Sequence, residues 1–159
     1  MKNYSLTSQE RSDYCVCSVV QAIFRAHKIN LSQDEIARNL TRSGDGFRVD
    51  DGIFSEFMKT NGFEYHHFVY NETPFNEPDT LLNEMNEHGG IVGIREPGQI
   101  YPHILRNHVY LLQNFEDPLL MLINPKNNGL VVKDIYTLRR EMARMEVGFF
   151  GLFREYIER

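Results

Sequence analysis

The hydrophobic pattern predicts helices in the first half of the chain. Apolar residues recur at helical spacing from Cys15 to Ala26, and further apolar side chains widen this face beyond an ordinary amphipathic stripe. We therefore expect a largely buried helix with Cys15 in or just before its first turn, and with Ser12 or Asp13 as its N-cap. Capping residues and terminal glycines predict three more helices. The first of these follows Ser32. The second runs from Asp50 or Asp51 to Asn61-Gly62, and the third runs from Pro78-Asp79 to Gly89-Gly90.

The second half of the chain consists of short apolar runs separated by turns, which predicts strands. The expected class is α+β, with N-terminal helices packed on a mainly antiparallel sheet. Because no repeat or linker interrupts the sequence, we expect a single domain over residues 1–159. The expected strands are Ile91–Ile94, His108–Asn114, Leu119–Asn124, Leu130–Val132 and Val147–Phe153, with a helix around Ile135–Met142.

Composition and charge narrow the classes of function. The 159 residues are 42% hydrophobic and 25% charged, as in an ordinary globular domain. A net charge of −5 without a basic stripe argues against a nucleic-acid partner. No apolar run reaches the ~20 residues that span a bilayer, and the N-terminus lacks the apolar core of a secretory signal. We expect no membrane span, and either a cytoplasmic protein or an effector exported without a standard signal peptide.

The positions of cysteine and histidine in the sequence give little support for a metal site or a disulfide. Cys15 and Cys17 are two residues apart, too close for a comfortable disulfide, so we expect reduced thiols. A zinc site would need distant histidines such as His66, His67 or His103. Neighbouring strand residues face opposite sides of a sheet, so His66 and His67 would not bind one ion together. We expect no metal and no other cofactor.

Four polar residues could together perform acyl transfer. Cys15 is expected at a helix N-terminus, where the amide dipoles favour the thiolate form of its side chain. His108 opens one strand and Asn124 ends the next, so the two could meet across a hairpin. Gln9, six residues before Cys15, can offer an amide N–H beside the thiol. This set contains a nucleophile, a base, an orienting group and an oxyanion donor.

The segments that carry these residues resemble the papain-like cysteine peptidases of the C39 type. That class processes bacteriocins in bacteria and is often fused to transporters. The resemblance rests on the Gln9–Cys15 segment, the apolar helix after it, the His108–Leu112 strand and the Ile123-Asn124-Pro125 turn. It departs from the family at Val16, where a glycine is common, so it is closer to the papain-like fold than to a leader-cleaving peptidase.

The resemblance implies a catalytic set and a reaction. Cys15 would be the nucleophile, His108 the base and Asn124 the orienting group. Gln9 and the Cys15 backbone N–H would form the oxyanion hole. We expect a cysteine-dependent hydrolase that cleaves a peptide or amide bond through a thioester. Since no transporter segment is attached, export or delivery would need a separate partner.

Other interpretations stay open. The same thioester could pass to an amine, as in an acyltransferase or a transglutaminase-type enzyme, and a protease effector could act on a host or competitor protein. A domain of this fold could also bind peptides without cleaving them. Cys15 could be a small core residue, His108 an ordinary strand histidine and Asn124 the start of a turn. We expect Cys17, on another face of the helix, to belong to the core.

Overall fold

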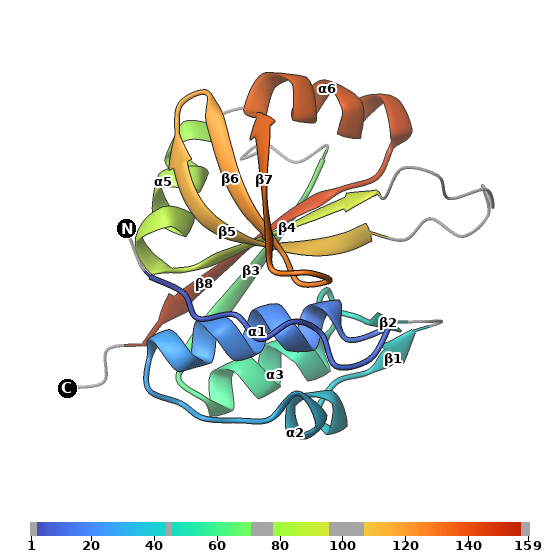
Figure 1. Ribbon diagram of the computed structural model, residues 1–159, viewed down its shortest axis with the longest axis vertical. Helices are drawn as coiled ribbons and strands as arrows, with labels where there is room; N and C mark the ends of the chain where they lie inside the picture. The colour runs from blue at the N-terminus through green and yellow to red at the C-terminus, as the bar shows by residue number, and fades with distance from the viewer. Residues whose placement is uncertain (1–2, 44–45, 71–77, 96–106, 157–159) are drawn as a thin grey trace.

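A six-stranded antiparallel sheet separates two layers of helices in the computed structural model (Figure 1). The structure describes residues 3–43, 46–70, 78–95 and 107–156. Helices α1 (Cys15–Ala26), α2 (Gln33–Arg38) and α3 (Gly52–Thr60) lie on one side of the sheet. Helices α5 (Pro78–His88) and α6 (Ile135–Met145) lie on the other. None of the helices in these described ranges is long and apolar enough to cross a membrane.

The order of strands in the sheet differs from their order in the chain. The last strand, β8, lies between β3 and β4, and every pairing in the sheet is antiparallel. A separate small hairpin joins β1 (Arg42–Ser43) to β2 (Gly46–Phe47). From edge to edge the sheet contains β3 (Phe63–Val69), β8 (Phe149–Glu155), β4 (Gly90–Arg95), β5 (Asn107–Glu116), β6 (Leu119–Asn124) and β7 (Gly129–Asp134).

Helix α1 has the bounds that its apolar periodicity predicts. Every residue from Val16 to Phe24 is buried, because the sheet covers one side of the helix and α2 packs against it as well. The predicted N-cap is wrong. Tyr14 holds that position and makes no capping hydrogen bond with its side chain, whose hydroxyl bonds to Asp34. The Asp13 carboxylate pairs with Arg42.

The remaining helix signals are confirmed. Ser32 caps α2 by accepting a hydrogen bond from the backbone N–H of Glu35. Of the two candidates before α3, Asp51 is the cap, with its carboxylate 2.8 Å from the Phe54 nitrogen. Gly62 and Gly89 follow α3 and α5 with φ angles of 89° and 142°, a region that L-residues with side chains rarely adopt.

The five predicted strands are present, but the expected separation of helices from sheet needs correction. Strand β3 comes from the helical half of the sequence and pairs with β8, from Phe63 opposite Glu155 to Val69 opposite Phe149. Apart from buried Phe63, each residue of β3 is half-buried, so no sharp alternation of apolar and polar residues marks it. Its partner is about 90 residues away in sequence, beyond the reach of any local signal.

Alternation along β5 joins the two halves of the core. Val109 and Leu111 belong to the apolar cluster that contains α1, whereas Tyr110 and Leu112 belong to the cluster beneath α5 and α6. Helix α1 thus packs directly against β5.

Candidate active site

The two cysteines have different environments. Cys15 is the first residue of α1 and is partly exposed, whereas Cys17 is completely buried. Burial, with smaller contributions from Cys15 and Asp13, raises the pKa of the Cys17 thiol to about 12. Cys17 is therefore a neutral core residue at physiological pH, as expected, and Cys15 is the accessible thiol.

His108 and Asn124 meet across the β5–β6 hairpin. The His108 Nε2 atom lies 2.7 Å from Asn124 Oδ1, and the backbone N–H of Lys126 donates to the same Oδ1 atom over 3.0 Å. Because a backbone N–H can only donate, the atom that receives it must be the amide oxygen. An oxygen acceptor in turn requires the proton of neutral His108 to be on Nε2. Nδ1 is then the basic nitrogen of the imidazole.

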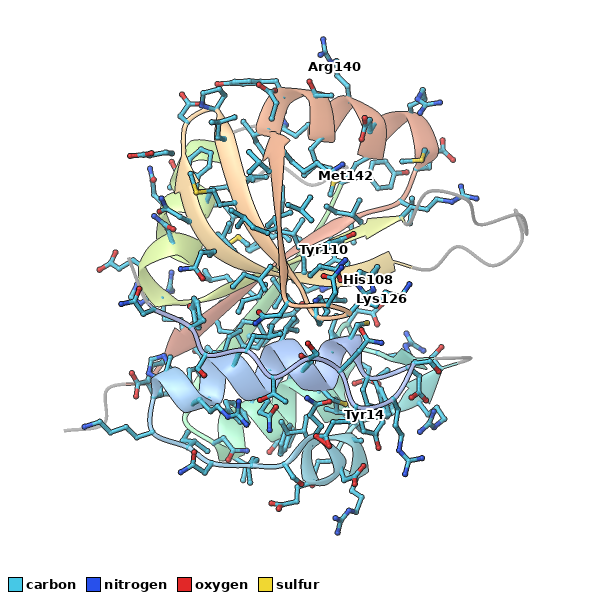
Figure 2. All side chains as sticks on the ribbon, viewed as in Figure 1. Tyr14, His108, Tyr110, Lys126, Arg140 and Met142 are labelled. Atoms are coloured by element: carbon cyan, nitrogen blue, oxygen red, sulfur yellow. The ribbon has the colours of Figure 1, made fainter. Side chains whose placement is uncertain are left out.

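Packing also fixes the His108 ring. The residue is 8% exposed, and its ring stands edge-on to that of Tyr110, with centroids 4.9 Å apart and planes at 87°. Figure 2 shows His108 and Lys126 above the N-terminal end of α1, the end that Tyr14 marks. The histidine and the helix end that carries Cys15 are thus on the same side of the molecule.

Gln9 connects the N-terminal segment to the turn after Asn124. Its backbone N–H donates to the carbonyl of Pro125 over 2.7 Å. Its side-chain Nε2 donates to the carbonyls of Arg11 and Ser12, at 3.1 and 3.0 Å. The amide therefore lies against the turn that leads into Cys15.

The geometry of Gln9 has a chemical consequence for its predicted role. Both N–H groups of the side chain face backbone carbonyls, and its Oε1 atom is buried with no hydrogen-bond partner among the described residues. To stabilise an oxyanion, the amide must transfer one N–H from a carbonyl to the substrate oxygen. The role of Gln9 as an oxyanion donor stays a prediction.

Buried glutamines that sequence reasoning did not select hold the Gln9 segment. Gln33 is completely buried, and its Nε2 lies 3.1 Å from each of the carbonyl oxygens of Thr7 and Ser8. Its Oε1 accepts the backbone N–H of Glu10 over 2.9 Å. Gln21, a polar residue within the apolar helix, also contacts Gln33 over 3.1 Å. The one sequence signal for this buried pair is the polarity of Gln21 within an apolar run, because no neighbouring residue distinguishes Gln33.

Two further contacts hold the residues just before Cys15. Asp13 forms an ion pair with Arg42, and the hydroxyl of buried Tyr14 donates to Asp34 over 2.7 Å. Arg42 and Asp34 come from β1 and α2. Contacts with β1 and α2 therefore hold the start of α1 in place.

Of the histidines considered for metal binding, His67 has a hydrogen-bond partner, because its Nδ1 lies 2.8 Å from the Tyr65 hydroxyl. His66 Nε2 lies 3.6 Å from the Glu64 carboxylate, beyond hydrogen-bond distance. Within the described residues no cluster of three or more His, Cys, Asp or Glu side chains could hold a metal ion. His103 lies outside the described residues.

Comparison with known proteins finds similarity in structure alone. No family model and no curated protein matches the chain. A double-glycine-motif protease from an AMS/PCAT transporter, solved in complex with the leader peptide, is 15% identical, with a TM-score of 0.64, over 97% of this chain and 93% of that one. The peptidase domain of Streptococcus ComA, a bifunctional ABC transporter of a quorum-sensing pathway, is 14% identical, with a TM-score of 0.67, over 96% and 99%. The chain has the fold of these peptidase domains, which confirms the expected papain-like architecture.

Proposed function

We propose that this chain is a cysteine peptidase that cleaves amide bonds through a thioester on Cys15. The observation that carries the proposal is the hydrogen bond from His108 Nε2 to Asn124 Oδ1, which leaves Nδ1 as the basic nitrogen of the imidazole. The fold shared with two peptidase domains supports it. So does the position of Cys15 as the first residue of α1, where the helix dipole favours a thiolate.

The proposed reaction gives each of these residues one role. His108 Nδ1 takes the proton of the Cys15 thiol, and the thiolate sulfur forms a bond to the carbonyl carbon of the substrate. The carbonyl oxygen becomes an oxyanion that the Cys15 backbone N–H and the Gln9 amide stabilise. Collapse of this intermediate breaks the C–N bond, and His108 gives its proton to the departing amine. Water then attacks the thioester carbon while His108 takes a proton from the water. The C–S bond of the resulting intermediate breaks, which releases the acid, and His108 returns its proton to the Cys15 sulfur.

Peptides with a Gly-Gly motif are the substrates to test first. One structural neighbour is a double-glycine-motif protease solved with a leader peptide. We extend that substrate class to this chain as part of the proposal. An amine could replace water in the second step, which would make the enzyme an acyltransferase.

Mass spectrometry of a peptide library tests the proposal. The library includes Gly-Gly peptides, and the purified protein is compared with its Cys15→Ala variant, with and without an added primary amine. We expect peptides with new C-termini from wild-type protein and not from Cys15→Ala. Peptides that carry the added amine at the new C-terminus would identify acyl transfer. Product sets that do not differ between wild type and Cys15→Ala would overturn the proposal, and intact peptides that stay bound would identify a binding domain.

The proposed site of action is a reducing compartment. The nucleophile must stay a thiol, and the chain holds only two cysteines, both as thiols. We propose the bacterial cytoplasm, with delivery as an exported effector through a separate partner as the alternative. Fractionation of producing cells, with detection of the chain in each fraction, separates the two.

A further inference from the structure

A buried polar network lies between α2 and the N-terminal segment, and the reaction described above does not use it. Gln33, the first residue of α2, donates to the carbonyls of Thr7 and Ser8 and accepts from the N–H of Glu10. Gln33 Nε2 also donates to the side-chain oxygen of Gln21, so its two hydrogens are shared among three acceptors. Both polar atoms of a completely buried side chain are thus hydrogen-bonded.

The network is anchored on both sides. Ser18 of α1 donates from its hydroxyl to the Thr7 carbonyl over 2.6 Å, and Gln21 donates to the Leu31 carbonyl over 3.0 Å. A buried network with satisfied members is rigid and has a defined geometry, because each group that loses its partner is left unpaired in a low-dielectric interior. Gln33 is therefore held firmly enough to define the position of the residues it contacts.

Those contacts flank Gln9. The backbone groups of Ser8 and Glu10 are bound to Gln33, and the N–H of Gln9 is bound to the Pro125 carbonyl. With three successive residues fixed, the direction in which the Gln9 side chain leaves the backbone is fixed as well. We propose that Gln33 is a positioning residue that acts through Gln9, holding its amide where it can serve the oxyanion. The inference rests on the proposed function.

Two chemical readouts distinguish positioning from general stability. Acylation is followed by release of aminomethylcoumarin from a fluorogenic peptide amide ending in Gly-Gly, and this step needs the oxyanion hole. Alkylation of Cys15 by iodoacetamide needs the thiolate but forms no oxyanion. A residue that positions Gln9 should affect the first rate and spare the second.

Gln33→Met keeps the length of the side chain and removes its hydrogen bonds, and Gln33→Glu keeps an acceptor for the Glu10 N–H. We expect each variant to acylate roughly 10- to 100-fold more slowly, since a displacement of about 1 Å can cost 10²-fold. Alkylation of Cys15 should stay within about twofold of wild type. The matched control is Asn86→Leu, which removes an amide that bridges α5 to Phe115 on the other face of the sheet. It should change neither rate.

A double-mutant cycle with Gln9→Ala decides whether Gln33 acts through Gln9. Gln9→Ala alone should lower acylation by about 10²–10³-fold, as expected for loss of an oxyanion donor. In that background Gln33→Met should add almost nothing. Additive losses, a parallel loss of alkylation, unchanged acylation in Gln33→Met, or failure of both Gln33 variants to fold would each overturn the inference. If wild-type protein neither acylates nor alkylates selectively at Cys15, the proposed function itself fails.

Discussion

At the scale of single residues, one oxygen atom sets the tautomer of His108, the proposed base. Asn124 Oδ1 accepts from both His108 and the backbone of Lys126, so its side chain cannot rotate without breaking two hydrogen bonds. This arrangement selects the Nε2–H tautomer of His108. In the proposed mechanism Asn124 orients the proton transfer but moves no proton itself.

Substitutions at these two residues should therefore have unequal effects. His108→Ala removes the base and should lower turnover of the Gly-Gly peptide by roughly 10²–10⁴-fold. Asn124→Ala leaves the imidazole in place and should lower it less. Steady-state kinetics with both variants at matched stability measures the difference. A His108→Ala variant as active as wild type would contradict the assignment.

The two thiols should also behave in opposite ways. Cys15→Ala should abolish turnover and leave the unfolding midpoint nearly unchanged, because Cys15 is partly exposed. Cys17 is fully buried, so Cys17→Ala should retain activity and destabilise the fold by about 1 kcal/mol, a common cost for a core truncation. Equal losses of activity in two equally stable variants would show that Cys15 is not the nucleophile.

At the scale of elements, the cap of α3 provides a direct test of local structure. The Asp51 carboxylate accepts the Phe54 N–H, whereas Asp50 is exposed and pairs with exposed Arg48. Asp51→Ala should lower the free energy of unfolding by about 0.5–2 kcal/mol. Asp50→Ala, the matched control, should change it by less than about 0.5 kcal/mol. Urea unfolding of both variants gives the comparison, and similar losses would place the cap elsewhere.

Local sequence signals predicted most helices and strands. They failed where a contact depends on a residue far away in the sequence. The bounds of α1 follow from its own apolar spacing, and the meeting of His108 with Asn124 follows from a hairpin between neighbouring strands. The Asp13 carboxylate, one of the two expected caps of α1, instead pairs with Arg42 of β1. Gln33 reaches residues more than 20 positions earlier in the chain, so its contribution to the site could not be read from spacing.

At the scale of the whole molecule, the candidate site exists only where two parts of the chain meet. Cys15 and Gln9 come from the N-terminal segment and α1, whereas His108 and Asn124 come from the β5–β6 hairpin. The packing of α1 on β5 and the bond from Gln9 to Pro125 join them. Unfolding should therefore remove the chemical difference between the two cysteines.

The most direct test of the central claim is the rate of Cys15 alkylation by iodoacetamide as a function of pH. Peptide mass spectrometry assigns each adduct in wild-type protein and in His108→Ala, with urea-unfolded protein as the control. A thiolate paired with imidazolium predicts rapid labelling of Cys15 in mildly acidic solution. Cys17, with its pKa near 12, should stay unlabelled there. His108→Ala should lose the acidic reactivity, and urea should make the two cysteines react alike. Wild-type Cys15 that reacts only at alkaline pH, or whose acidic reactivity survives His108→Ala, would contradict the account.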